Sequence, residues 1–344
     1  MTPSRDSLIE TFLRSHDWGG AGRSVLAGDA SHRRYDRVVD GPHTAVLMDA
    51  PPPQEDIRPF IAIARHLTGL GYSAPQILAA DEAAGLLLLE DLGDDTYTNV
   101  LAGGGDETAL YELAVDVLID LHQRPTGQAL CAGLPAYGNG RLMDEAFLAP
   151  QWTYAAFAGA MPPEDVRRAY GNIWLGLFEH IHKGPKTLVL RDYHVDNLLW
   201  LPKRPGIKAC GLLDFQDAVI GHPAYDLMSL LEDARRDIDD GLKATMLERY
   251  FSALPDLDRD AFMTAFAILA AQRHAKVIGI FTRLCQRDGK PDYLVHIPRV
   301  WRLLQAALEN PALADMRCWF DTHMPATMRG IPPRSNEHPM EASS

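Results

Sequence analysis

Residues 187–215 read TLVLRDYHVDNLLWLPKRPGIKACGLLDF, and this stretch decides the fold. Apolar runs at its start, middle and end predict three short strands. A polar loop with Asp192 and Asn197 follows the first run, and Asp214 follows the third. The turn between the last two runs is rich in Pro, Lys and Gly and cannot continue a strand. The pattern therefore predicts three oxygen-bearing side chains at the ends of adjacent strands. The three runs are residues 187–190, 198–201 and 209–213.

Asp192, Asn197 and Asp214 carry oxygen atoms of the kind that Mg²⁺ takes as ligands, together with water and phosphate oxygens. Phosphoryl transfer from ATP needs such a set. We predict that Asp192 orients and deprotonates an attacking hydroxyl, while Asn197 and Asp214 hold the metal against the triphosphate. A lone Asp after a strand is more often a turn former or a cap. Two Asp and one Asn in this order, between apolar strands, favour the catalytic interpretation.

The motif DYHVDN at 192–197, followed by LDF at 213–215, resembles the catalytic loop of aminoglycoside phosphotransferase-like kinases. These kinases are relatives of the protein kinases, whose motifs are H-R-D-L-x-x-x-N and D-F-G. This chain has Leu190 where protein kinases have His, and Gln216 where they have Gly. His194, two residues after the catalytic Asp, matches the small-molecule kinases.

Within that superfamily, the chain resembles the bacterial anomeric kinases for N-acetylmuramate and N-acetylglucosamine from about residue 24 to about residue 304. The resemblance implies transfer of the γ-phosphoryl group of ATP, with Mg²⁺, to the 1-hydroxyl of the sugar in cell-wall recycling. No feature of composition or spacing indicates a sugar. The segments that carry this resemblance are residues 28–35, 45–51, 87–93, 192–197 and 213–218.

The resemblance implies an α+β, bilobal protein-kinase-like fold with a small antiparallel-sheet nucleotide lobe and a larger, mainly helical lobe. Alternating strand patterns near the start of the chain agree with this fold. We expect the nucleotide lobe over residues 1–92, with a hinge near 88–93. The catalytic and substrate lobe is expected over 93–310. Residues 311–344 are expected to form a tail whose end is disordered.

The turn Gly28-Asp29-Ala30-Ser31 falls where such kinases cover the phosphates with a hairpin, and small residues there let backbone N–H groups approach the phosphates. The third strand has Met48 where a phosphate-binding Lys is usual. Arg33 and Arg34 are the nearest cations, and because they point to opposite faces of a strand only one can face the nucleotide. The alternative is a solvated surface pair, but a triphosphate without a nearby cation would be poorly stabilised, so we assign Arg33 to this role. The helix expected at 57–70 has no central Glu, and only Glu55 precedes it.

Residues 90–94 interrupt an apolar run where the family has its hinge. We assign Glu90 and Leu92 to nucleotide binding through their backbone groups. The side chains of Glu90 and Asp91 are expected to be solvated or to form caps.

Three residues are candidates for binding the substrate: His194, Asp217 and Arg273. His194 and Asp217 are candidates because they lie in the two motif loops, although Asp217 could equally support the metal site. Arg273 and Lys276 lie three residues apart on a long helix expected at 260–287, and a solvated helix face is an equally favoured interpretation of this cluster. Arg273 is the candidate for binding the lactyl carboxylate of N-acetylmuramate, because its guanidinium can bind a carboxylate with two hydrogen bonds. Asp226 is expected to give structural support to the catalytic loop.

The composition excludes several classes of partner. A formal net charge of -13 argues against nucleic acid or an anionic membrane as the main partner. The four Cys are scattered without metal-binding spacing, as expected for reduced thiols in the cytoplasm. The N-terminus has no apolar region typical of a signal peptide, and no apolar run approaches the roughly 20 residues needed to cross a bilayer. We expect a cytoplasmic protein whose partners are a nucleotide and an amino sugar.

Three alternatives remain. The acceptor could be another small molecule, such as an aminoglycoside, choline or another amino alcohol. A protein kinase is disfavoured by Leu190, by Gln216 and by the absence of an Ala-Pro-Glu motif in the activation loop. A non-catalytic nucleotide-binding pseudokinase is suggested by Met48, but the three intact residues of the catalytic motif argue against it.

Overall fold

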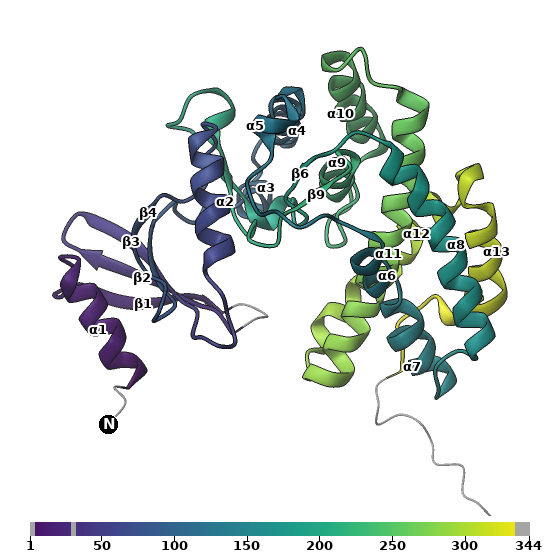
Figure 1. Cartoon of the computed structure of the whole chain (residues 1–344), viewed down its shortest axis with the longest axis horizontal. Coiled ribbons are helices and arrows are strands. Elements are labelled where there is room, and N and C mark those ends of the chain that lie inside the picture. The colour runs from purple at the N-terminus through teal and green to yellow at the C-terminus, as the bar shows by residue number, and fades with distance from the viewer. Residues whose placement is uncertain (1–3, 29–31, 334–344) are drawn as a thin grey trace, which may run out of the picture. The chain divides into compact units, whose positions relative to one another are not determined.

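A computed structural model describes residues 4–28 and 32–333 and divides the chain into two compact units. The first unit comprises Met1–Asp120, Cys131–Gly133 and Leu190–Ala218, and the second comprises Leu121–Leu130, Leu134–Val189 and Val219–Ser344. Figure 1 shows the elements of both units. None of the helices in the described ranges has the combined length and apolar character of a membrane-spanning segment.

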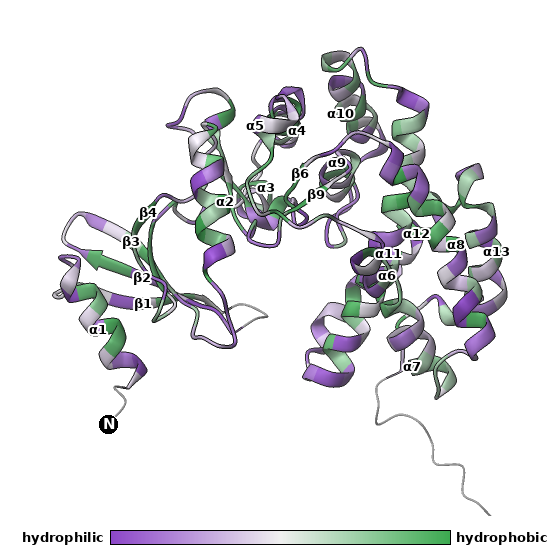
Figure 2. Ribbon diagram, viewed as in Figure 1, coloured by the Kyte–Doolittle hydropathy of each residue, from purple (hydrophilic) through white to green (hydrophobic). Residues whose placement is uncertain are grey.

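The first unit is built on a five-stranded antiparallel sheet with the order β1-β2-β3-β5-β4. Alternation of side chains along the strands gives this sheet two different faces. One face packs against α1, with Val38, Leu47 and Leu88 in that core. Figure 2 shows hydrophobic colouring along β3, in agreement with the burial of its residues 45–48. The strands are β1 (Gly22–Gly28), β2 (Arg34–Asp40), β3 (His43–Asp49), β4 (Ile77–Asp81) and β5 (Leu86–Glu90), and the helix is α1 (Arg5–Ser15).

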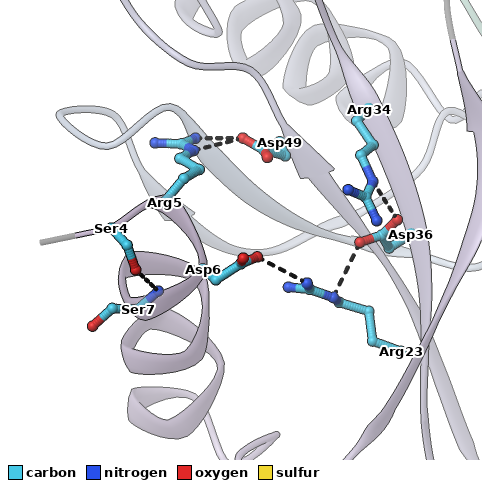
Figure 3. Close-up of polar contacts among 8 residues, drawn as sticks. All are labelled: Ser4, Arg5, Asp6, Ser7, Arg23, Arg34, Asp36 and Asp49. Atoms are coloured by element: carbon cyan, nitrogen blue, oxygen red, sulfur yellow. Dashed lines mark hydrogen bonds and ion pairs between the residues drawn. The ribbon is translucent and has the colours of Figure 1, made fainter.

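Helix α1 is fixed to the sheet by polar contacts as well as by its apolar face. Ser4 caps the helix by accepting a hydrogen bond from the backbone N–H of Ser7. The Arg5 guanidinium donates to the Asp49 carboxylate on β3, with Nε to Oδ1 at 2.8 Å. These contacts lie at the start of the helix (Figure 3).

The other face of the sheet carries Tyr35, Val46 and Leu89, which line a cavity together with Phe60 of α2 (Arg58–Gly69). Phe60 also contacts Phe215, with ring centroids 5.0 Å apart. Phe215 directly follows Asp214, so this contact ties α2 to the loop that carries the predicted metal ligands.

The catalytic stretch contributes a two-stranded hairpin, β7 (Leu198–Trp200) and β8 (Cys210–Leu212), to the first unit. Bridges join Gly211 to Ser73 and Leu199 to Thr96. These pairings explain why the compact unit extends past the expected boundary at 92 to include this hairpin. The remaining elements are α3 (Tyr97–Ala102), α4 (Glu107–Gln123), of which residues 121–123 belong to the second unit, and the 3₁₀ turns at Val195–Asn197 and Gly206–Ala209.

The apolar run at 187–190 does not pair with the hairpin, contrary to the expected adjacency of three strands. Its strand, β6 (Thr187–Val189), pairs antiparallel with β9 (Val219–Gly221) in the second unit. Partner choice for such short apolar strands depends on tertiary packing, which the local sequence does not show.

The second unit is mainly helical and is organised around α11 (Arg259–Asp288). Nearly every residue from 268 to 279 on this helix is buried, because α6, α9 and α12 and the π-helical segment at Ala149–Tyr154 all pack against it. Its other helices are α5 (Thr126–Ala129), α6 (Asn139–Ala146), α7 (Ala155–Ala158), α8 (Glu164–Lys183), α9 (Ala224–Leu231), α10 (Asp240–Ala253), α12 (Ile297–Leu308) and α13 (Ala314–His323), with 3₁₀ turns at Pro291–His296, Pro311–Leu313 and Ala326–Met328.

Long-range packing shapes two parts of this unit. Residues 139–158 are divided into α6, the π-helical segment and α7 and do not form one continuous α-helix. Gly279 of α11 passes so close to this region that an added Cβ would lie 2.2 Å from the backbone of Leu148. The expected tail includes α13, whose Trp319 stacks on Tyr170 of α8 with ring centroids 4.3 Å apart. Burial of this aromatic side chain makes α13 part of the folded unit.

Candidate active site

The loop that carries the predicted catalytic residues has an unusual backbone. Arg191 and Asp214, which flank the site in sequence, adopt φ angles of 74° and 56°. Left-handed conformations are uncommon in residues other than Gly and are concentrated at functional sites. The Leu213 backbone N–H donates to the Asn197 carbonyl at 2.9 Å, which extends the β7–β8 pairing to Asn197 and to the residue that precedes Asp214.

Asp192, Asn197 and Asp214 converge as the sequence predicts. The Asn197 side-chain amide donates to the backbone carbonyl of Asp192 at 2.9 Å and lies 3.3 Å from the Asp214 carboxylate. The second carboxylate oxygen of Asp214 accepts a hydrogen bond from Gln216 at 2.6 Å. Gln216, which stands where protein kinases have Gly, therefore orients the carboxylate. Sequence reasoning had used it only to exclude a protein kinase.

The donor set fits Mg²⁺. Asn197 and Asp214 offer hard oxygen ligands, with the amide nitrogen of Asn197 only 3.3 Å from the carboxylate. Within the ranges that the structure describes, no three His, Cys, Asp or Glu side chains form a cluster able to hold a metal by themselves. Two protein ligands would therefore need phosphate oxygens and water to complete the shell, which is the usual way that Mg²⁺ is held in kinases.

A cavity of about 310 Å³ joins the catalytic loop to the expected hinge. Its volume lies near the lower end of the range for small-molecule sites. The wall is mostly apolar, as a stacked purine base requires, while Asn197 and Asp214 supply polar groups. Its lining residues are Leu26, Tyr35, Val46, Phe60, Pro75, Leu89, Glu90, Asp91, Leu92, Gly93, Asn197, Leu199, Leu213 and Asp214. Glu90 and Leu92, which the sequence analysis assigned to nucleotide binding, line this cavity. The sequence analysis did not single out the apolar residues of the wall.

The hinge side chains were expected to be solvated or to form caps, and Asp91 does cap the backbone by accepting the N–H of Gly93 at 3.0 Å. Arg residues also hold these side chains, so they are not simply solvated. Arg37 of β2 donates to Asp91 through Nε at 2.7 Å and to Asp94 through Nη1 at 2.8 Å. Hydrogen bonds with Asp94 and Asp91 raise the pKa of Arg37, and the bond with Arg37 lowers the pKa of Asp94. Glu90 pairs with Arg204 at 2.6 Å. Long-range ion pairs of this kind leave no local pattern in the sequence.

The predicted phosphate-covering turn is described only in part. Gly28 ends β1, whereas Asp29, Ala30 and Ser31 lie outside the described residues. Met48, at the usual Lys position of β3, is 1% exposed.

Among the substrate candidates of the first unit, His194 is buried and lies beside Asn197, with Nε2 3.3 Å from the amide nitrogen. Asp217 has a half-exposed side chain and pairs with Arg191, with Oδ1 and Nη1 3.8 Å apart. The structure therefore brings His194 next to Asn197, one of the two predicted metal ligands.

Arg273 and Asp226 belong to the second unit. Arg273 is 8% exposed and donates to the Tyr225 hydroxyl at 3.1 Å. Its neighbour Lys276 pairs with the buried Glu145 at 3.2 Å. The solvated-face interpretation of this cluster is thus wrong, because α11 is packed on all sides. Asp226 is fully buried in the first turn of α9, and its support of the catalytic loop stays a prediction.

The fold resembles that of protein-kinase-like phosphotransferases. Choline kinase LicA from Streptococcus pneumoniae superposes with a TM-score of 0.60 at 14% identity, covering 90% of this chain and 98% of that structure. The GDP complex of aminoglycoside 2'-phosphotransferase-IIIa gives a TM-score of 0.60 at 15% identity, covering 90% and 99%. These similarities confirm the predicted fold class.

Sequence comparison gives the family. The model of the phosphotransferase enzyme family matches residues 23–263, and the chain belongs to this family. An N-acetylmuramate/N-acetylglucosamine kinase of Caulobacter vibrioides is 37% identical, over 96% of this chain and 99% of that protein. A protein of the same name from Pseudomonas aeruginosa is 38% identical, over 90% and 92%. The predicted resemblance to N-acetylmuramate/N-acetylglucosamine kinases is therefore confirmed.

Proposed function

We propose that this protein transfers the γ-phosphoryl group of ATP to the 1-hydroxyl of N-acetylmuramate, N-acetylglucosamine or both. One observation carries the proposal: Asn197 and Asp214 line the same cavity as the hinge residues Glu90 and Leu92. A nucleotide whose base lies at the hinge would extend its phosphates towards the two metal ligands. We infer the sugar substrate from the names of the relatives, which are N-acetylmuramate/N-acetylglucosamine kinases.

Each residue of the loop has a separate role in this proposal. The Asp192 carboxylate accepts the proton of the sugar hydroxyl as the new bond from oxygen to the γ-phosphorus forms and the bond to the ADP oxygen breaks. Asn197 and Asp214 would hold Mg²⁺, which neutralises charge on the phosphate oxygens when bound. Asn197 also fixes the backbone carbonyl of Asp192, so it links the metal ligands to the general base.

The acceptor is tested with the purified protein, ATP, Mg²⁺ and a panel that contains both amino sugars, an aminoglycoside, choline and ethanolamine. ADP release should depend on an amino sugar. A 1-O-methyl glycoside of N-acetylglucosamine is the matched control, because it lacks only the free anomeric hydroxyl. It should give no turnover, and the product of the free sugar should lose its reducing end. A reducing product would place the phosphate elsewhere on the ring, and turnover with choline alone would overturn the sugar assignment.

A pseudokinase is the second candidate, because Met48 removes the usual third-strand Lys. The same assay decides this point. Nucleotide binding without ADP release on any acceptor of the panel would favour the pseudokinase.

We further propose that the protein acts in the cytoplasm, where ATP is available.

A further inference from the structure

The usual phosphate clamp of a protein-kinase-like site is missing from its usual positions. That clamp is a Lys on the third strand paired with a Glu on the following helix. On β3 of this chain, Val46 lines the cavity, and the next residue on the same face is the buried Met48. Helix α2 contains no Glu within Arg58–Gly69. Both members of the pair are therefore absent from these positions.

A different ion pair lies close by. The Arg33 guanidinium is 3.3 Å from the Glu55 carboxylate, measured from Nε to Oε2. Both side chains are largely withdrawn from solvent, at 13% and 15% exposed. The other oxygen of Glu55 accepts the backbone N–H of His32 at 3.0 Å. Glu55 thus fixes both the backbone and the cation of this segment from the loop that precedes α2.

Arg33 directly precedes β2 (Arg34–Asp40), whose side chains alternate between the two faces of the sheet. Arg37 binds the hinge acids Asp91 and Asp94, and Tyr35 lines the cavity. Counting back from Arg37 in steps of two residues gives Tyr35 and then Arg33, so Arg33 is further from the hinge than either. In an extended chain it lies about 7 Å from Tyr35 and about 13 Å from Arg37. A base at the hinge would therefore place its phosphates towards Arg33. Tyr35 is also paired in register with Met48, so Arg33 is displaced by one strand and two residues from the usual Lys position.

Arg34, the residue after Arg33, makes a different ion pair. It points to the opposite side of the strand and pairs with the buried Asp36 at 3.0 Å, and Asp36 also pairs with Arg23 (Figure 3). Because Arg34 is half exposed and Asp36 keeps Arg23 as a second partner, loss of Arg34 leaves no buried charge unpaired.

We propose that Arg33 binds the α- and β-phosphates of the nucleotide and that Glu55 positions it, so that this pair replaces the third-strand Lys and the helix Glu. The proposal rests on the proposed use of ATP by this chain. It gives the phosphate site a cation that enters from the second strand, and it gives Glu55 a role that sequence reasoning had not recognised.

The test compares the affinities of ATP, ADP and adenosine, measured by calorimetric titration with Mg²⁺ and without acceptor. Arg33→Ala should weaken ATP and ADP binding about tenfold or more, the range for a lost charged hydrogen bond, and should leave adenosine affinity within about twofold. Glu55→Gln should change the ratio of ATP to adenosine affinity in the same direction by a smaller factor. Arg34→Ala is the matched control and should alter neither affinity by more than about twofold. Arg33→Ala/Met48→Lys should recover part of the ATP affinity, because it restores a cation at the usual position.

Equal losses of ATP and adenosine affinity in Arg33→Ala would show that Arg33 only supports the fold and would overturn the proposal. Unchanged ATP affinity would overturn it as well. Failure of the wild-type protein to bind ATP would overturn the proposed function and this inference with it. A wild-type protein that binds ATP but phosphorylates no amino sugar would reject the sugar assignment alone, and the ATP-to-adenosine ratio would still decide the role of Arg33.

Discussion

The amide nitrogen of Asn197 lies 2.9 Å from the backbone carbonyl oxygen of Asp192 and 3.3 Å from the Asp214 carboxylate. One side chain therefore connects the predicted general base to the predicted metal ligand. The three residues are assembled within a single unit of the chain. Substitution of each residue in turn should show whether it acts on ATP binding, on turnover or on both.

Asp192→Asn should abolish most turnover while leaving ATP binding largely intact. The substitution keeps the backbone carbonyl that binds Asn197 but removes the acceptor for the hydroxyl proton. The rate should fall by on the order of 10²–10⁴-fold. Steady-state turnover at saturating substrate and ATP titration measure the two quantities. Near-native turnover would show that Asp192 is not the general base.

Asp214→Ala should weaken Mg²⁺–ATP binding as well as turnover, because it removes the charged member of the metal site. The measurement is the Mg²⁺ concentration dependence of ATP binding and of turnover. Gln216→Ala is a useful control, since it removes the 2.6 Å hydrogen bond to Asp214 but keeps the carboxylate, and it should have a smaller effect. A Mg²⁺ dependence unchanged in Asp214→Ala would exclude this residue from the metal site. Asn197→Ala should act in the same direction but more mildly, because a neutral ligand is lost.

Arg273→Ala should reduce the transition-state stabilisation for N-acetylmuramate, calculated from kcat/KM, by about 1.5–3 kcal/mol if the guanidinium binds the lactyl carboxylate. The value for N-acetylglucosamine, which lacks that group, should change much less. Tyr225→Phe is the matched control, because it removes only the hydroxyl that Arg273 contacts at 3.1 Å. Equal losses for both sugars in Arg273→Ala would mean that this buried side chain only stabilises α11 against α9. No loss for either sugar would remove Arg273 from substrate binding.

His222 should make the free energy of unfolding depend on pH. The residue is 3% exposed, and its Nδ1 accepts the backbone N–H of Ala224 at 3.1 Å, so the folded state requires the neutral ring. Burial, with a smaller effect from Lys186, lowers the pKa of His222 from 6.5 to about 4.

Because the unfolded state binds this proton first, the stabilisation is complete above pH 6.5 and is lost as the pH falls towards 4. The loss from this group should reach about 3 kcal/mol. Urea unfolding between pH 7 and pH 4 measures the effect, and His222→Asn should show a smaller decline with pH than the wild type. His43→Asn, at an exposed position, is the control. Parallel curves for the wild type and His222→Asn would contradict the prediction.

Local sequence pattern was sufficient for the strands of the nucleotide-binding sheet and for the catalytic motif. Strand alternation and turn residues act over a few neighbours, so they are visible in the chain itself. Asp192, Asn197 and Asp214 converge because a short hairpin joins them, and the Leu213–Asn197 backbone bond completes that hairpin.

Other features depend on segments that are distant in the sequence. The pairing of Arg33 with Glu55, of Arg37 with Asp91 and of Arg204 with Glu90 joins residues 22, 54 and 114 positions apart. The sequence alone does not show which partner any of these charges meets. Only packing of the sheet, the loop before α2 and the catalytic hairpin brings their partners within reach.

The chain's own pattern was enough to predict an antiparallel sheet near its start, the three residues of the catalytic motif and the absence of a third-strand Lys. Only the tertiary structure shows that residues 268–279 of α11 are buried on every face, that α13 packs on α8 and that β6 pairs with β9. It also placed Arg191 and Asp214 in left-handed conformations, which residues other than Gly seldom adopt without surrounding contacts that hold them. The physical reason is that backbone periodicity is a local property, whereas burial, strand partners and ion pairs are set by the contacts that the folded chain makes at long range.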